Sequence, residues 1–90
     1  MAEKYWYKIE TSKDKEGTYH YHGSSPLPVE ELIATLKHGD FIRLDELLYM
    51  ERGVYKEWAE WDKTLVPAAY ISASCILSVM QYKSDPRTIS

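Results

Sequence analysis

Two histidines and one glutamate are the residues whose types and spacing come nearest to a metal site. His20 and His22 lie two positions apart, so both imidazoles project from the same face of a β-strand. A hairpin register would place Glu10 opposite His20 on the neighbouring strand. Imidazole and carboxylate ligands suit zinc and related ions, but the next candidate ligand, His38, is distant in sequence. We therefore expect a solvated strand face here and no bound metal.

Cys75 is the single cysteine of the chain and its single candidate thiol nucleophile. It lies beside Ile76 and Leu77, with no basic neighbour in sequence to activate it, so we expect a small core residue. The four glycines form neither a phosphate-binding loop nor a nucleophile elbow. These observations predict a protein that is not an enzyme and that binds no cofactor.

The single cysteine also indicates the cellular compartment of the protein. One cysteine allows no intrachain disulfide, which is typical of proteins in a reducing environment. The sequence begins MAEKYWY, without the basic and apolar regions of a signal peptide, and no apolar run approaches the ~20 residues of a spanning helix. We expect a cytoplasmic protein that does not cross a membrane.

Negative charge is concentrated in the middle of the chain. Residues 40–62 hold seven acids and three bases, a balance of −4 within a net charge of −3. The same segment contains Tyr and Trp side chains, which dominate binding energy at protein interfaces, while acids at the rim would steer a basic partner. We expect a protein-interaction surface there, formed by Tyr55, Trp58, Trp61, Asp45, Glu57 and Glu60.

The first hairpin offers an alternative surface of another class. Trp6 could stack on a base while Lys8, Lys13 and Lys15 contact phosphates. A nucleic-acid-binding domain usually presents a basic face, which a chain of net charge −3 does not readily supply. Nucleic-acid binding is therefore the second hypothesis, and metal binding through His20 and His22 is the third.

Hydrophobic periodicity predicts the elements that must position these residues. Alternation over 4–11 and 18–22 predicts a hairpin with its tyrosines directed inward. A helix is expected to begin near Pro28 and to end at Gly39. Its apolar face, with the spacing i, i+3, i+4 and i+7, consists of Val29, Leu32, Ile33 and Leu36.

The second half of the chain is less regular. Alternation over 40–44 predicts a third strand. Tyr70 and Ile71, a short turn at 72–74 and residues 76–82 predict the closing strand. Residues 54–65 fit both a strand and a helical stripe. We favour a strand there, because Val54, Tyr55 and the nearby tryptophans suit a pleated surface.

Together these elements predict one small α+β domain over residues 1–83, with a flexible polar tail at 84–90. The expected architecture is an antiparallel sheet of about five strands, in the order strand–strand–helix–strand–strand–strand, with one helix covering a face. An exposed sheet edge and an aromatic-rich composition favour a homodimer. The expected function is a self-associating protein-interaction module.

Overall fold

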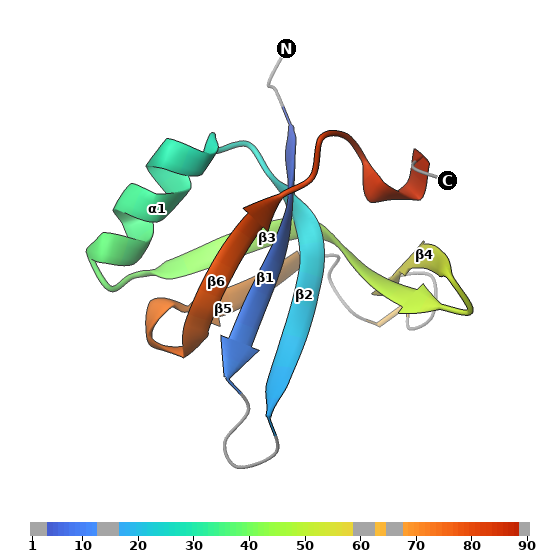
Figure 1. Cartoon of the computed structure of the whole chain (residues 1–90), viewed down its shortest axis with the longest axis horizontal. Coiled ribbons are helices and arrows are strands. Elements are labelled where there is room, and N and C mark those ends of the chain that lie inside the picture. Colours follow the sequence, from blue (N-terminus) through green and yellow to red (C-terminus); the bar gives the residue numbers. More distant parts are fainter. Residues whose placement is uncertain (1–3, 13–16, 59–62, 65–67, 89–90) are drawn as a thin grey trace.

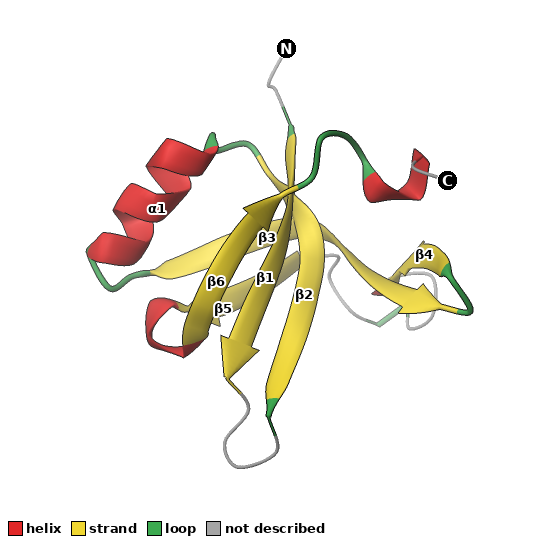
Figure 2. Ribbon diagram, in the orientation of Figure 1, coloured by secondary structure: helices red, strands yellow, loops and turns green. Residues whose placement is uncertain are grey.

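The computed structural model describes residues 4–12, 17–58, 63–64 and 68–88. It contains one α-helix and an antiparallel sheet, so the predicted α+β class is confirmed (Figures 1 and 2). The strands are β1 (Tyr5–Ser12), β2 (Thr18–Ser25), β3 (Phe41–Glu51), β4 (Val54–Glu57), β5 (Ala68–Ser72) and β6 (Ile76–Gln81). The helical elements are α1 (Val29–Lys37) and the short 3-10 turns η2 (Ala73–Cys75) and η3 (Pro86–Thr88).

The sheet runs in the order β4-β3-β2-β1-β6, with β5 pairing separately with β3. β6, β1 and β2 form one layer, and β5 with the first half of β3 lies behind it (Figure 1). The side chains between the layers form the core, while α1 closes one side. The fully or almost fully buried members of this core are Tyr7, Ile9, Leu32, Ile42, Leu44 and Ile71.

α1 contributes less to the core than its apolar stripe predicts. Leu32 is completely buried, and Val29 and Leu36 are partly buried against the core. Ile33, which we expected on the same face, is 36% exposed. The helix has nine residues and packs on the sheet through a narrow contact, so one stripe of side chains fits beneath it.

A bulge bends β3 in the middle and gives its two halves different partners. Its first half pairs with β5 and its second half with β4, and the register against β2 shifts between His22 and Ser24. Glu46 lies at this bulge with a positive φ of 48°. Opposite it, a Cβ on Gly23 would lie 3.0 Å from the carbonyl oxygen of Asp45, so the close approach of the strands favours glycine there.

The separation of β5 from β6, the length of β3 and the exposure of Cys75 differ from the sequence-based expectation. The chain has six strands, because β5 is separated from β6 by η2, and β3 continues to Glu51 instead of ending at Leu44. The strand favoured over 54–65 is present at Val54–Glu57, while 59–62 and 65 lie outside the described residues. Cys75 is exposed and not in the core, because it ends η2 at the margin of the sheet.

The C-terminal segment, expected as a flexible tail over 84–90, is packed where the structure describes it. Pro86 is buried, and η3 lies beside the end of β4. The backbone N–H of Tyr82 donates to the carbonyl oxygen of Trp6 over 2.8 Å, which ties the start of this segment to β1. Residues 89–90 lie outside the described part.

Candidate functional site

The second half of β3 and β4 form a hairpin that extends away from β1, β2 and β6 (Figure 1). Its two-residue loop, Arg52–Gly53, has positive φ at both positions, 53° and 82°. This is the geometry of a type I′ turn, whose twist matches that of the flanking strands. Near this tip Met50 is 54% exposed and Val54 is 56% exposed. Because Met50 pairs with Tyr55 and Val54 pairs with Glu51, these two apolar side chains lie on opposite faces of the hairpin.

The aromatic residues expected at the interaction surface lie on both faces of this hairpin. Tyr55 pairs with Met50 across the strands and turns toward β2. Trp58 lies against the ring of Tyr49, with the ring centroids 4.7 Å apart. Trp61 and Glu60, the other two members from that stretch, fall outside the described residues.

The acids of the same segment are matched by bases of this chain. Arg43 donates to Asp45 over 2.8 Å, and Arg87 donates to Glu57 over 3.1 Å. Glu46 accepts from Arg87 over 3.3 Å and also pairs with Lys4. Lys4 and Arg87, which lie outside residues 40–62, therefore pair with two acids of the segment, Glu46 and Glu57, which the local charge count could not reveal.

Arg87 is the centre of this charge network and was not identified from the sequence. Its guanidinium donates to both carboxylate oxygens of Asp85 and lies over the ring of Trp6, 5.1 Å from the centroid. The neighbouring carboxylates raise the pKa of Arg87, and the hydrogen bond from Arg87 lowers the pKa of Asp85. The sequence signal was faint, since Asp85-Pro86-Arg87 reads as an ordinary polar terminus.

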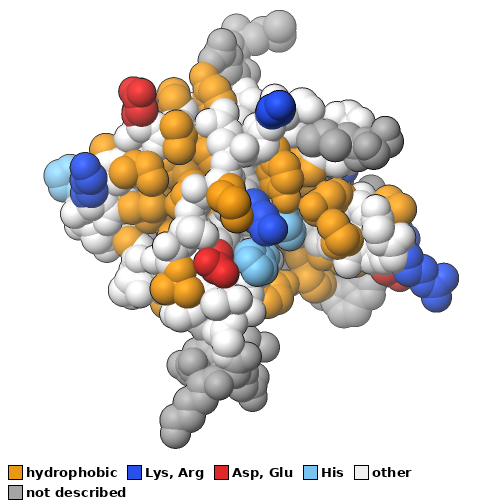
Figure 3. Space-filling view, in the orientation of Figure 1, with side chains coloured by type: hydrophobic (Ala, Val, Ile, Leu, Met, Phe, Trp, Pro, Cys, Tyr) orange, Lys and Arg blue, Asp and Glu red, His pale blue; other side chains and the backbone are white. Residues whose placement is uncertain are grey.

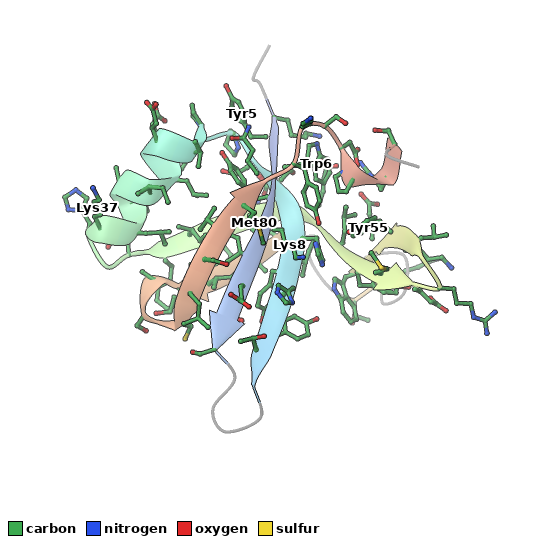
Figure 4. The ribbon with its side chains drawn as sticks, viewed as in Figure 1. Tyr5, Trp6, Lys8, Lys37, Tyr55 and Met80 are labelled. Atoms are coloured by element: carbon green, nitrogen blue, oxygen red, sulfur yellow. The ribbon has the colours of Figure 1, made fainter. Side chains whose placement is uncertain are left out.

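Trp6 is consequently closed to the role that the nucleic-acid hypothesis gives it. Its side chain is 6% exposed, with Arg87 and Lys4 over its ring. Lys8 lies on the same sheet face beside Met80 (Figure 4), and Lys13 and Lys15 lie outside the described residues. Within the described part, the hairpin therefore presents no open aromatic platform next to its lysines.

The expected metal-ligating residues lie on the outer face of β1 and β2 but take different partners. His20 Nε2 is 3.5 Å from Glu10 Oε2, and Glu10 also accepts from the hydroxyl of Ser78 over 3.2 Å. His22 Nδ1 is 2.8 Å from the hydroxyl of Tyr82. A group of three or more histidine, cysteine or acidic side chains placed to hold a metal is not found among the described residues.

His22, Tyr55 and Tyr82 form a cluster that joins β2, β4 and the residue after β6. The hydroxyls of Tyr55 and Tyr82 are 3.2 Å apart, and the rings of His22 and Tyr55 meet edge to face with centroids at 5.3 Å. Burial, with contributions from Lys8 and His20, lowers the pKa of His22. Burial and the hydrogen bond with Tyr55 raise the pKa of Tyr82. His22 and Tyr82 are therefore both neutral at physiological pH.

This cluster sits within a mixed surface. On the face shown in Figure 3, hydrophobic side chains spread over the sheet and helix, and a small group of charged and histidine side chains lies near the centre. Figure 4 places Lys8 in that central region, between Met80 and Tyr55. The Nδ1 atom of His22 is already hydrogen-bonded to the hydroxyl of Tyr82, which engages one of the two ring nitrogens.

An open cleft of about 200 Å³ lies at the other end of the sheet. It is lined by side chains of β1, β2, β5 and η2 that carry no charge: Thr11, Ser12, Tyr21, Tyr70, Ile71, Ser72 and Cys75. None of the described residues that line the cleft is a histidine, so no described side chain there would act as a base toward the thiol of Cys75.

Comparison of the chain with protein-family models, with curated proteins and with solved structures yields no match. Among the described residues, no helix has the length and apolar character needed to cross a bilayer. The geometry of the chain itself is therefore the basis for its proposed function.

Proposed function

We propose that this chain is a small protein-interaction module that contacts its partner through the β3–β4 hairpin. The observation that carries the proposal is the exposure of Met50 and Val54 near the tip of an element that extends from the sheet. Apolar side chains of this size gain free energy when a partner covers them, at about 25 cal/mol per Å² of apolar area. The turn at Arg52–Gly53 fixes the strands before binding, which reduces the ordering cost.

The partner that suits this surface has an apolar contact patch with polar groups around it. Tyr49 and Trp58 provide further aromatic area on one face of the hairpin. Steering of a basic partner depends on the acids that stay exposed, and Glu51 is one of these, although Lys56 lies 3.7 Å from it. We therefore assign the affinity to apolar contact and give charge the smaller part.

The proposal also includes self-association and a cytoplasmic location. An exposed free thiol at Cys75 is compatible with a reducing compartment, where it would not be oxidised to a disulfide. We propose no catalytic activity, because His22, the imidazole most embedded in the fold, is engaged by Tyr82. The bond to Tyr82 gives His22 a structural role.

A capture experiment with two matched double variants tests the hairpin. In Met50→Lys with Val54→Lys, each lysine replaces an exposed apolar side chain, and the second of them would face Glu51, so the fold should be kept. In Leu77→Lys with Gln81→Lys, the same charge is added to β6. Both variants and the wild type are used to capture protein from a nuclease-treated lysate.

The proposal predicts a discrete protein that binds the wild type and the β6 variant and loses at least about tenfold affinity, about 1.4 kcal/mol, for the hairpin variant. Equal capture by all three baits would contradict it. Recovery of nucleic acid before nuclease treatment, and of nothing afterwards, would favour the nucleic-acid hypothesis instead.

A further inference from the structure

β6 lies at the end of the main sheet, and one of its edges is open in the described structure. It pairs antiparallel with β1 from Tyr7↔Gln81 to Ile9↔Val79. Because the N–H of Tyr82 is bonded to Trp6, alternation along the strand turns the N–H groups of Val79 and Gln81 away from β1. In Figure 1 the opposite side of β6 faces away from β1 and β2. This edge therefore offers backbone donors and acceptors to another strand.

The side chains on this edge lack two of the usual protections against pairing, charge and proline, although a bulge lies at Leu77, where the register against β1 shifts. Natural edge strands carry charges, proline or strong irregularity, which discourage edge-to-edge contact. Residues 64–82 contain no Asp, Glu, Lys, Arg or His, and β6 has no proline. Leu77 is 58% exposed and Met80 is 49% exposed. β4, at the other end of the same sheet, is shorter and charged, because it has four residues and carries Lys56 and Glu57.

The absence of charge also indicates the partner strand. An uncharged edge gives a charged peptide no ion pair, whereas a second copy of the same strand brings no like charges into opposition. In antiparallel pairing about a two-fold axis, the first flanking charge, Lys83, falls near residues 73–75 of the other copy, which are uncharged. Because of the two-fold symmetry, the exposed apolar side chains of both protomers lie in the same interface.

We propose that two copies of this chain pair antiparallel through β6 and extend the sheet across a two-fold axis near Val79. With the axis at Val79, Ser78 lies opposite Met80 of the second copy, and Leu77, at the bulge, comes nearest to Gln81 of the second copy. The outward N–H groups of Val79 and Gln81 donate to backbone carbonyls of the second copy. This inference rests on the self-association part of the proposed function and names its surface, which is separate from the β3–β4 hairpin.

Sedimentation velocity of charge-swapped variants tests this interface. The wild type should sediment at twice 10.5 kDa at micromolar concentration. Leu77→Lys with Gln81→Lys should sediment as a monomer, because lysines from the two copies would face each other. Leu77→Glu with Gln81→Glu should also be monomeric, and an equimolar mixture of the two variants should recover the dimer.

Met50→Lys with Val54→Lys is the control, since it adds the same charge to equally exposed positions elsewhere and should stay dimeric. A dimer lost in this control and kept in the β6 variants would place self-association on the hairpin and overturn the inference. Partner capture by the monomeric β6 variants shows separately whether the hairpin proposal holds. A monomeric wild type would overturn the β6 dimer without affecting the hairpin.

Hydrogen exchange of the wild type keeps the inference testable if the β6 variants fail to fold. The amides of Val79 and Gln81 should exchange at least about tenfold more slowly at dimer-forming concentration than on dilution. The amides of Met80 and Tyr82, which face β1, should change much less. Equal rates for Val79 and Gln81 at both concentrations would contradict the interface.

Discussion

The hydroxyl of Tyr82 lies between His22 and Tyr55, at 2.8 Å and 3.2 Å, and links two strands to the segment after β6. We expect Tyr82→Phe to lower the free energy of unfolding by about 1 to 3 kcal/mol, since two partly buried polar groups lose their partner. Tyr70→Phe is the control, because Tyr70 is 66% exposed. Urea unfolding of both variants measures the difference, and equal midpoints would contradict a structural role for the Tyr82 hydroxyl.

The lowered pKa of His22 has a consequence for stability against pH. Since the folded chain binds this proton less readily than the unfolded chain, stability is full above the ordinary histidine pKa of 6.5. It falls as the pH drops through the lower, folded value. Thermal unfolding at pH 7 and at about pH 5 should show this loss.

The Lys8→Met variant tests how much the charge of Lys8 contributes to the lowered pKa of His22. Removing the positive charge of Lys8 should raise the pKa of His22 toward its usual value, as followed by its imidazole resonances in NMR. Lys37→Met on α1 is the control, since Lys37 lies on the far side of the domain (Figure 4). A His22 titration that both variants leave unchanged would mean that Lys8 does not act on it.

Among individual residues, the sequence identified His20, His22 and Glu10 as sharing a face of the hairpin, and the structure places them there. It did not identify Tyr82 or Arg87. Tyr82 is 60 positions from its partner His22, and Arg87 is 41 positions from its partner Glu46. Local spacing in the sequence therefore could not indicate these contacts.

At the scale of elements, the narrow contact of α1 predicts unequal effects of its apolar residues. Leu32→Ala should cost about 2 to 5 kcal/mol, because it removes a completely buried side chain. Ile33→Ala should cost less than about 1 kcal/mol, because that side chain is already 36% exposed. Similar losses in urea unfolding would show that the helix packs in another orientation.

The C-terminal turn η3 should stabilise the domain through Arg87. Arg87→Ala removes bonds to three carboxylates and the contact with Trp6, so we expect a loss of about 1 to 2 kcal/mol. Arg43→Ala is a matched control, since Arg43 makes an exposed pair with Asp45 and should cost less than about 1 kcal/mol. A neutral Arg87→Ala in chemical denaturation would support the flexible tail expected from the sequence.

Elements with a strong local signal were predictable. Alternation placed β1 and β2, and the stripe from Val29 to Leu36 placed α1, within a few residues of their observed bounds. The length of β3 was not predictable, because its bulge at Glu46 interrupts the alternation where the strand changes partners. Cys75 was misplaced because its apolar neighbours Ile76 and Leu77 suggested a buried strand, whereas η2 ends there.

At the scale of the whole molecule, the α+β class followed from the order of the elements, while the surfaces depended on their packing. Two acids of the segment 40–62, Glu46 and Glu57, pair with Lys4 and Arg87 from outside it, so the net charge of the segment says less about a partner than its apolar tip does. The hairpin tip and the edge of β6 are far apart along the sheet order. The two proposed surfaces would therefore not compete for the same part of the sheet.

Photo-crosslinking at the hairpin tip tests whether the β3–β4 hairpin binds a partner protein. A photoreactive p-benzoylphenylalanine at Val54, in an otherwise wild-type chain, is irradiated in a nuclease-treated lysate of cells that produce the protein. We predict one discrete crosslinked protein, which disappears with excess unlabelled wild type and persists with excess Met50→Lys, Val54→Lys variant. Loss of the crosslink with both competitors, or no discrete product at Val54, would contradict binding through the hairpin.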